Sequence, residues 1–178
     1  AATHAFHPRV ADILNNMGIL YHSKKNLDKA IFFHRQALKI WEKVLGSAHP
    51  RLGIAYTHLG SIYVKKDSIH HAENYMQKGL ATLTGVFGLH HPYVVWTLNE
   101  LGSLYRDEQK DSVAIDYYNR ALQSNHFPLK ADSSKNIKFE QVLSLNYLLH
   151  TLAQKGDACT SLYEKAGHIN TLIDAIDT

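Results

Sequence analysis

The sequence predicts an all-α fold, in which antiparallel helix pairs stack into a solenoid. Three observations lead to this prediction: a repeat of 42 residues, apolar side chains at helical spacing within each repeat, and His-Pro corners between repeats. A repeated helix pair cannot bury its apolar face alone, and stacking on its neighbours buries that face. A row of stacked helix pairs is therefore expected.

The period is visible in columns of identical residues. The His-Pro pair begins at His7, His49 and His91. Further columns keep the same spacing: Gly18, Gly60 and Gly102; Tyr21, Tyr63 and Tyr105; Ala30, Ala72 and Ala114; Leu38, Leu80 and Leu122. These columns place three repeats at about residues 8–48, 50–90 and 92–126.

Each repeat contains two helical stripes separated by a polar break. In the first repeat the first stripe is Val10, Ile13, Leu14, Met17 and Tyr21, and the second is Ala30, Ile31, Phe33, Ala37, Leu38, Trp41 and Leu45. Intervals of three and four residues place such side chains on one face of a helix. Each stripe is therefore predicted to be a helix with one buried face.

The corner between repeats has a glycine, a histidine and a proline with separate roles. Gly46 is expected to end a helix as a left-handed cap, and Pro50 suits the first turn of the next helix, where no amide donor is lost. The side chain of His49 can cap the exposed amides of that turn. Within the repeat, Gly18, Gly60 and Gly102 are expected to face the alanines Ala30, Ala72 and Ala114 and allow a close helix contact.

The pattern becomes weaker after Leu122. A polar connection over residues 123–136 is followed by apolar residues that predict a degenerate fourth helix pair and a capping helix, over about residues 134–178. In this register Ala158 corresponds to Ala114, with a spacing of 44 residues. The whole chain, 1–178, is expected to form a single domain.

The pattern resembles the tetratricopeptide repeat, in the 42-residue form found in kinesin light chains. The resemblance rests on the Leu/Met-Gly pair, the tyrosine three residues later, the following alanine, the "LG..HP" corner and the twin asparagines Asn15 and Asn16. It covers about residues 5–125. It implies a right-handed superhelix whose inner wall is made by the first helix of each repeat, and an adaptor that binds a partner protein or peptide there without catalysis.

The candidate binding residues lie on that inner helix, about one hundred degrees from its buried stripe. They are Asn15, Asn16, His22, Thr57, His58, Ser61, Lys65, Trp96, Asn99, Glu100 and Arg106. Amide side chains donate and accept hydrogen bonds at once, so they can hold the backbone of an extended peptide. The resemblance assigns this role to Asn15, Asn16 and Asn99, and Trp96 would anchor a partner side chain.

Two alternatives remain open for the function. The inner wall can be filled by the chain itself or by a second copy, which would make the array a structural or regulatory assembly module. RNA association, known from clustered-mitochondria proteins with this long repeat, has only the net charge of +3 in its favour. A clamp for a terminal carboxylate is disfavoured because only Lys65 and Arg106 supply cations.

The sequence contains no recognisable motif for catalysis, metal binding or a cofactor. The pairs His70-His71 and His90-His91 lack further ligands at metal-binding spacing, and no nucleotide-binding or nucleophile motif occurs. The single Cys159 cannot form an internal disulfide, which fits a reducing compartment. We therefore expect a soluble, cytoplasmic protein without a cofactor, which does not bind membranes.

Overall fold

The computed structural model describes residues 7–124 and 150–161, and these residues contain helices and no strand. The helices are α1 (Pro8–Ser23), α2 (Leu27–Leu45), α3 (Pro50–Lys65), α4 (Ile69–Phe87), α5 (Pro92–Asp107) and α6 (Asp111–Ser124), and residues 150–161 are also helical. The all-α prediction is confirmed. None of the helices in these ranges is long and apolar enough to cross a membrane.

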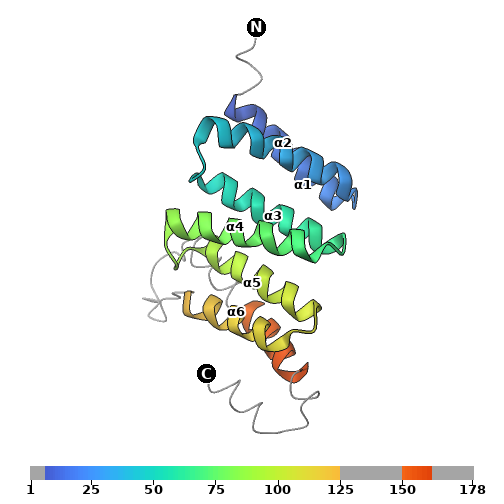
Figure 1. Cartoon of the computed structure of the whole chain (residues 1–178), viewed down its shortest axis with the longest axis vertical. Helices are drawn as coiled ribbons and strands as arrows, with labels where there is room; N and C mark the ends of the chain where they lie inside the picture. Colours follow the sequence, from blue (N-terminus) through green and yellow to red (C-terminus); the bar gives the residue numbers. More distant parts are fainter. Residues whose placement is uncertain (1–6, 125–149, 162–178) are drawn as a thin grey trace, which may run out of the picture. The chain divides into compact units, whose positions relative to one another are not determined.

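The six labelled helices form three antiparallel pairs, each within one predicted repeat (Figure 1). The chain divides into two compact units, Ala1–Phe87 and Gly88–Thr178. In the first unit α1 packs on α2, α3 packs on α4, and α2 contacts α3. In the second unit α5 packs on α6.

The histidine of each corner caps the helix that follows it, as predicted. The backbone amides of Arg9, Arg51 and Tyr93 donate to the Nδ1 atoms of His7, His49 and His91, each over 3.2 Å. The prolines then occupy the first helical turn, where a missing N–H leaves no hydrogen bond unmade. Three helices therefore begin with the same cap.

The glycine of the corner adopts a different conformation from the one predicted. Gly46 has φ 77° and ψ 167°, so φ is positive as expected, but the residue is extended and is not a left-handed helical cap. This region of conformational space is open almost only to glycine, because a Cβ atom would clash with the backbone. Gly88 shares the positive φ of 77°.

Left-handed caps occur instead at the end of the first helix of each repeat. Lys25, Asp67 and Gln109 have φ values of 59°, 55° and 59°. In the first repeat the amide of Lys25 donates to the carbonyl of His22, and the amide of Asn26 donates to that of Tyr21. This pair of hydrogen bonds is the Schellman motif, which satisfies the last carbonyls of a helix.

A stack of two aromatic rings recurs at this end of each helix pair. The stacks are Tyr21 on Phe33, Tyr63 on Tyr75, and Tyr105 on Tyr117, with centroid distances of 5.2, 5.4 and 5.4 Å and interplanar angles of 8°, 5° and 8°. The tyrosine column therefore has the same surroundings in all three repeats, and the period in the sequence corresponds to a period in packing.

The helical glycines allow close packing, although their main neighbours are not the alanines. A Cβ atom on Gly18 would lie 2.7 Å from Cδ2 of His34, and one on Gly102 would lie 2.4 Å from Cε1 of Tyr118. Gly60 alone has the predicted alanine among its nearest neighbours, through the carbonyl of Ala72, beside Met76. The glycine thus makes room for the side chain one turn beyond the alanine.

One residue of the predicted buried stripe is exposed. Ile13 in α1 is 60% exposed, whereas Ala55, its equivalent in α3, is fully buried. The difference arises because α2 precedes and contacts α3, while no helix precedes α1 among the described residues. The apolar stripe of α1 therefore has two edges. One edge faces the partner helix α2, and the other edge, where Ile13 lies, faces the position of a preceding helix.

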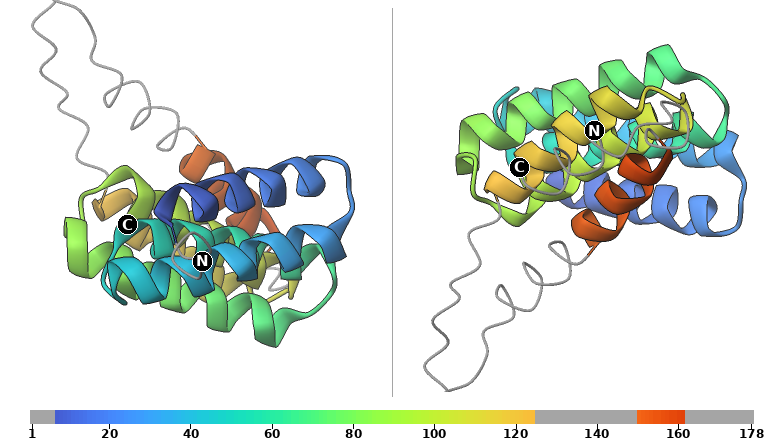
Figure 2. Two further views of the ribbon diagram at one scale, coloured as in Figure 1. Left: turned by 90° about the horizontal axis from the view of Figure 1, so that it is seen from above. Right: turned by 90° about the horizontal axis from the view of Figure 1, so that it is seen from below.

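The helix at residues 150–161 packs within the second unit (Figures 1 and 2, orange-red). Ala158 lies in its interior and packs with Ala114 and Tyr118 of α6. The spacing of 44 residues predicted that Ala158 corresponds to Ala114 and lies near the start of a second helix. In the structure, residues 150–161 form one continuous helix, and Ala158 packs against Ala114. The predicted fourth pair otherwise lies in residues 134–149 and 162–178, outside the described residues.

Candidate peptide-binding face

Several predicted site residues of the first unit lie on α1 and α3. We call Asn16, His22, His58, Ser61 and Lys65 the α1–α3 face. Asn16 and Lys65 are exposed, and the other three are half-buried. Both helices present polar side chains here because their apolar stripes point toward α2 and α4.

A hollow of about 230 Å³ lies beside this face. Its lining comes from three helices: Asp12, Asn15 and Asn16 of α1, Trp41 of α2, and Arg51 and Ile54 of α3. An ion pair of 3.0 Å between Arg51 and Asp12 links α1 to α3. The sequence placed Asn15 and Asn16 in the candidate site, and the structure adds Trp41 and this ion pair, which no motif indicated.

Asn15 has a structural contact beneath the face. The Nδ1–H of His34 donates to Oδ1 of Asn15 over 3.0 Å, and the ring of His34 stacks on His58 with a centroid distance of 5.9 Å. The amide oxygen of Asn15 therefore orients a buried imidazole of α2.

The histidines of this cluster are neutral at pH 7. Burial, and to a smaller extent the nearby His58 and His22, lower the pKa of His34 to about 4. Burial also lowers the pKa of His58 to about 4, with a smaller contribution from His22. A neutral imidazole has one donor and one acceptor nitrogen, so His58 can add polarity to the face without charge.

His22 and Lys65 join the far ends of α1 and α3. Nζ of Lys65 donates to Nε2 of His22 over 2.8 Å. Burial, and then the charge of Lys65, lower the pKa of His22. Lys65 thus supplies the positive charge of the α1–α3 face, at the end away from the hollow.

Another candidate of α3, Thr57, is turned toward the interior. Thr57 is fully buried, and its Oγ1 donates to the carbonyl of Gly53 over 3.1 Å. The same oxygen would lie 2.5 Å from a Cβ atom on Gly79 of α4, so Thr57 packs between α3 and α4. Ser61 donates to the carbonyl of Thr57 over 3.2 Å and is only half-buried. In this structure Thr57 is therefore not accessible to a ligand.

In the second unit, residues 150–161 cover the equivalent positions. Asn99 is 2% exposed, and its Oδ1 accepts a hydrogen bond of 2.9 Å from Oγ1 of Thr151. Arg106 donates to Gln154, and it lies 3.7 Å from Asp157 and 3.4 Å from Asp107. Asn99 and Arg106 therefore hold a neighbouring helix of the same chain.

The two remaining candidates are half-buried residues of α5. Trp96 packs edge-on against Tyr93, with ring centroids 6.5 Å apart. Glu100 lies on the same helix, one residue after Asn99, and is half-buried. The predicted anchor role of Trp96 stays a prediction.

The described residues contain no cluster of three or more histidine, cysteine or acidic side chains that could hold a metal ion. The Cys159 thiol is buried, and burial raises its pKa, which disfavours the reactive thiolate.

The fold and this face define an all-helical repeat protein, in which antiparallel pairs carry a polar face on the first helix of each repeat. Sequence models of the tetratricopeptide repeat match residues 9–84 and residues 97–125, which together make up more than half of the chain. The chain belongs to the tetratricopeptide repeat family, as the resemblance indicated.

Solved structures of kinesin light chain-like proteins share the fold. BtubC (BKLC) from P. vanneervenii is 21% identical with a TM-score of 0.69; the match covers 96% of this chain and 62% of BtubC, so this chain spans less than two thirds of that protein. A Podosopora anserina protein described as a kinesin light chain with nearly identical TPR-like repeats is 14% identical, with a TM-score of 0.60 and coverage of 96% and 93%. Among curated proteins, none matches this chain.

Proposed function

We propose that this chain is a non-catalytic adaptor that binds an extended peptide of a partner protein on the α1–α3 face. Tetratricopeptide repeats are generally protein-interaction scaffolds. The observation that carries the proposal is the hollow of about 230 Å³ beside Asn16, which α1 to α4, the described helices of the same unit, leave exposed.

The chemistry of the face suits a peptide backbone. Asn16 can donate to a carbonyl and accept from an amide of an extended chain at the same time. Ile54 and Trp41 give the hollow apolar walls for one partner side chain. Lys65 can attract an acceptor or a negative charge at the other end, since it is an exposed residue.

The test begins with a ligand selected from a random peptide display library. Its affinity for the wild-type chain and for Asn16→Ala/Lys65→Ala is measured by isothermal titration calorimetry, and we expect a loss of about tenfold, since two hydrogen-bonding groups are removed. Asn99→Ala is the matched control, because it removes an amide at the covered position of the second unit. Unchanged affinity in the double variant, with an unchanged melting temperature, would contradict the proposal.

The structural alternative is favoured by the second unit. There the chain covers its own candidate residues, since Thr151 bonds to Asn99 and Gln154 bonds to Arg106. If the array serves assembly, the α1–α3 face should be covered in the same way by a second copy. Sedimentation velocity at increasing concentration would then show self-association that Asn16→Ala/Lys65→Ala abolishes, and no selected peptide would bind.

RNA association predicts a steep loss of affinity with added salt, because contacts to phosphates release counterions. The small net charge of +3 argues for a protein ligand instead. A cytoplasmic location remains part of the proposal and rests on the single cysteine of the sequence.

A further inference from the structure

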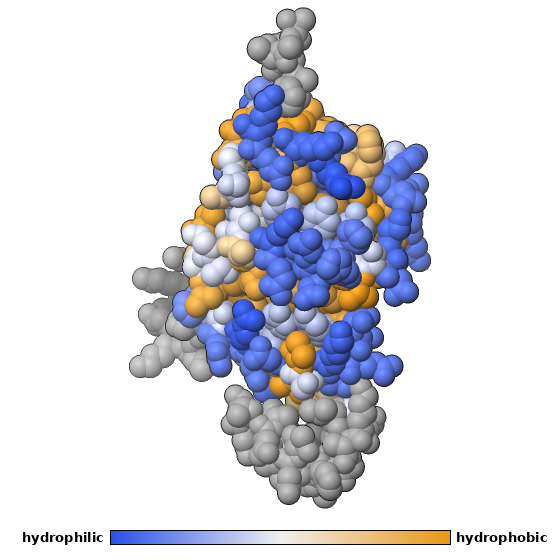
Figure 3. All heavy atoms as spheres, viewed as in Figure 1, coloured by the Kyte–Doolittle hydropathy of each residue, from blue (hydrophilic) through white to orange (hydrophobic). Residues whose placement is uncertain are grey.

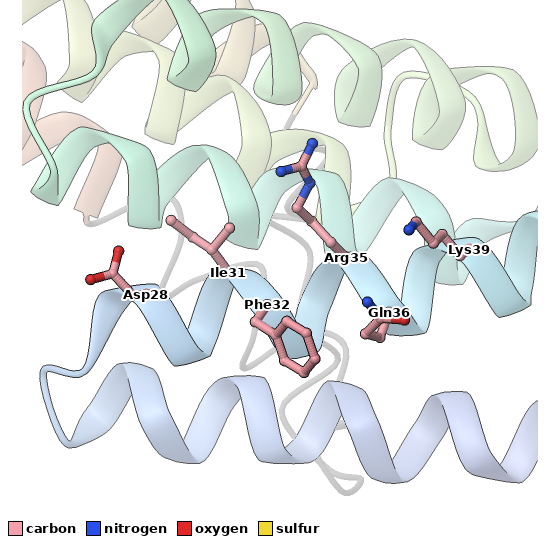
Figure 4. Close-up of a pocket in the computed structure, with 6 residues that line it drawn as sticks. All are labelled: Asp28, Ile31, Phe32, Arg35, Gln36 and Lys39. Atoms are coloured by element: carbon pink, nitrogen blue, oxygen red, sulfur yellow. The ribbon is translucent and has the colours of Figure 1, made fainter.

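An exposed side of α2 combines apolar and basic side chains. Phe32 is 55% exposed, and it lines a hollow of about 400 Å³ together with Ile31, Arg35 and Lys39 (Figure 4). Asp28 and Gln36 complete this lining. Aromatic and arginine side chains are enriched in protein interfaces, so their combination here indicates a contact surface.

A second hollow, of about 180 Å³, extends this side toward α4. It shares Arg35 and Lys39 with the first hollow and adds Lys78 of α4, whose ammonium group lies 5.9 Å from the centroid of the Tyr75 ring. Hydrophilic residues (blue) gather over α2 and α4 in the face shown in Figure 3. Arg35, Lys39 and Lys78 thus line one hollow.

The carboxylates nearby are already engaged. Asp28 forms an ion pair with Lys66, and Glu42 accepts a hydrogen bond of 2.6 Å from the hydroxyl of Tyr56. Burial, followed by this contact with Glu42, raises the pKa of Tyr56, so its hydroxyl keeps the proton that it donates. Among the residues that the structure describes, no acidic side chain forms a salt bridge with any of the three cations. The two hollows therefore have an excess of positive charge.

We propose that this surface, the α2–α4 face of Ile31, Phe32, Arg35, Lys39 and Lys78, binds an acidic segment of a partner protein. One apolar side chain of the segment packs on Phe32, and carboxylates on either side pair with the cations. The face uses no residue of the α1–α3 face, so the chain can hold two partner segments at once.

A nucleic acid fits this face less well than a peptide does. Asp28 and Glu42 line the two hollows and would repel an unbroken row of phosphates. Separate carboxylates on a peptide can lie beside the cations and away from these acids. The exposed ring of Phe32 also favours a ligand with an apolar side chain, because burial of apolar surface adds to the binding free energy.

The test uses a fluorescein-labelled peptide of twelve residues, composed of glutamate with leucine and phenylalanine at every third or fourth position. Its anisotropy is measured with the full chain and with Arg35→Glu/Lys39→Glu/Lys78→Glu, and we expect the affinity to fall about tenfold or more. The matched control, Arg9→Glu/Lys24→Glu/Lys25→Glu, changes three exposed cations of the same unit by the same charge and should retain binding. Circular dichroism checks that all three proteins are folded.

Further probes separate the remaining outcomes. A peptide with glutamine in place of every glutamate should bind at least about tenfold more weakly, and Phe32→Ser should weaken binding of the acidic peptide. The proposal is overturned if the two triple variants lose the same affinity, or if Asn16→Ala/Lys65→Ala abolishes binding instead. A twelve-nucleotide RNA of mixed sequence tests the assignment to a protein partner. That assignment is overturned if the RNA binds more tightly than the peptide and the Arg35→Glu/Lys39→Glu/Lys78→Glu variant loses RNA binding.

Discussion

Equivalent repeat positions have different environments in the two units. Asn15 of the first unit is half-buried beside a hollow, whereas Asn99 of the second unit is 2% exposed and bonds to Thr151. His22 pairs with Lys65 and leaves the lysine exposed, whereas Arg106 is engaged by Gln154 and Asp157.

The difference shows that a column of the repeat does not by itself determine accessibility. Accessibility depends both on the residue type at the position and on whether the next helix along the chain packs over it. In the second unit the next described helix brings Thr151 and Gln154 against α5, and polar residues that could bind a ligand become internal contacts. The open face therefore belongs to the first unit.

Acidification should destabilise the first unit more than any other change considered. The pKa of both His34 and His58 is lowered from 6.5 to about 4 in the folded state. The unfolded chain then binds more protons, so the stability present above pH 6.5 is lost as pH falls through 6.5 toward 4, by about 3 kcal/mol for each of the two imidazoles. Urea denaturation of the full chain at pH 7 and pH 4.5 measures this loss.

The control for this prediction comes from the repeat itself. Met76 occupies the position of His34 in the second repeat and Tyr118 occupies it in the third, so His34→Met replaces the imidazole by a side chain that the fold already uses there. The variant should lose a large part of the pH dependence. If the stability of His34→Met depends on pH as strongly as that of the wild type, His34 is not the source of the pH dependence.

Filling the space at the helical glycines should affect both units similarly. Gly102→Ala and Gly18→Ala place a Cβ atom 2.4 and 2.7 Å from the rings of Tyr118 and His34, and each should destabilise by about 1–3 kcal/mol. Gly85→Ala is the control, since nothing lies within 4 Å of its Cβ position, and it should stabilise α4 by about 0.5–1 kcal/mol. Thermal unfolding measures all three, and equal effects at Gly102 and Gly85 would refute the close contact.

Removing the asparagine at this repeat position, Asn15 in the first unit or Asn99 in the second, should cost different amounts of stability in the two units. Asn99→Ala leaves the hydroxyl of Thr151 without its acceptor in a buried site and should cost about 1–2 kcal/mol. Asn15→Ala should cost less, because Asn15 is only half-buried and water can replace its contact with His34. Hydrogen exchange should show faster opening of residues 150–161 in Asn99→Ala. A larger loss in Asn15→Ala would reverse the comparison.

The smallest effect is expected at the left-handed caps, which occur in both units. Lys25→Gly and Gln109→Gly should each stabilise by about 0.5–1 kcal/mol, because glycine has no Cβ atom to strain at a positive φ. Lys24→Gly is the matched control, since Lys24 has φ −79° and should gain nothing. A gain at Lys24 equal to that at Lys25 would show that the conformation is not the cause.

Much of the fold could be predicted from the sequence because local chemistry repeats with it. The spacing of His49, Pro50 and Gly60 gave the corner, the cap and the close helix contact. The left-handed caps were missed because Lys25, Asp67 and Gln109 are not glycines and share no residue type.

The candidate site could be predicted only in part. Neighbouring positions on a helix differ by about one hundred degrees, so a small error in the orientation of the buried stripe moves Thr57 from the surface to the interior. Asn16 and Lys65 are exposed residues of the first helix of their repeats, and their binding role stays a prediction. The covering of Asn99 depends on residues 150–161, whose sequence does not keep the 42-residue period.

The most direct test of the account is the chemical shift map of the isotopically labelled full chain, titrated with a display-selected peptide. We expect amide shifts to change in α1 and α3, at Asn16, His58 and Lys65, while residues 150–161 keep their shifts and exchange protection. Shift changes confined to α5, with loss of protection at residues 150–161, would contradict the account, because the peptide would then bind by displacing the chain's own helix.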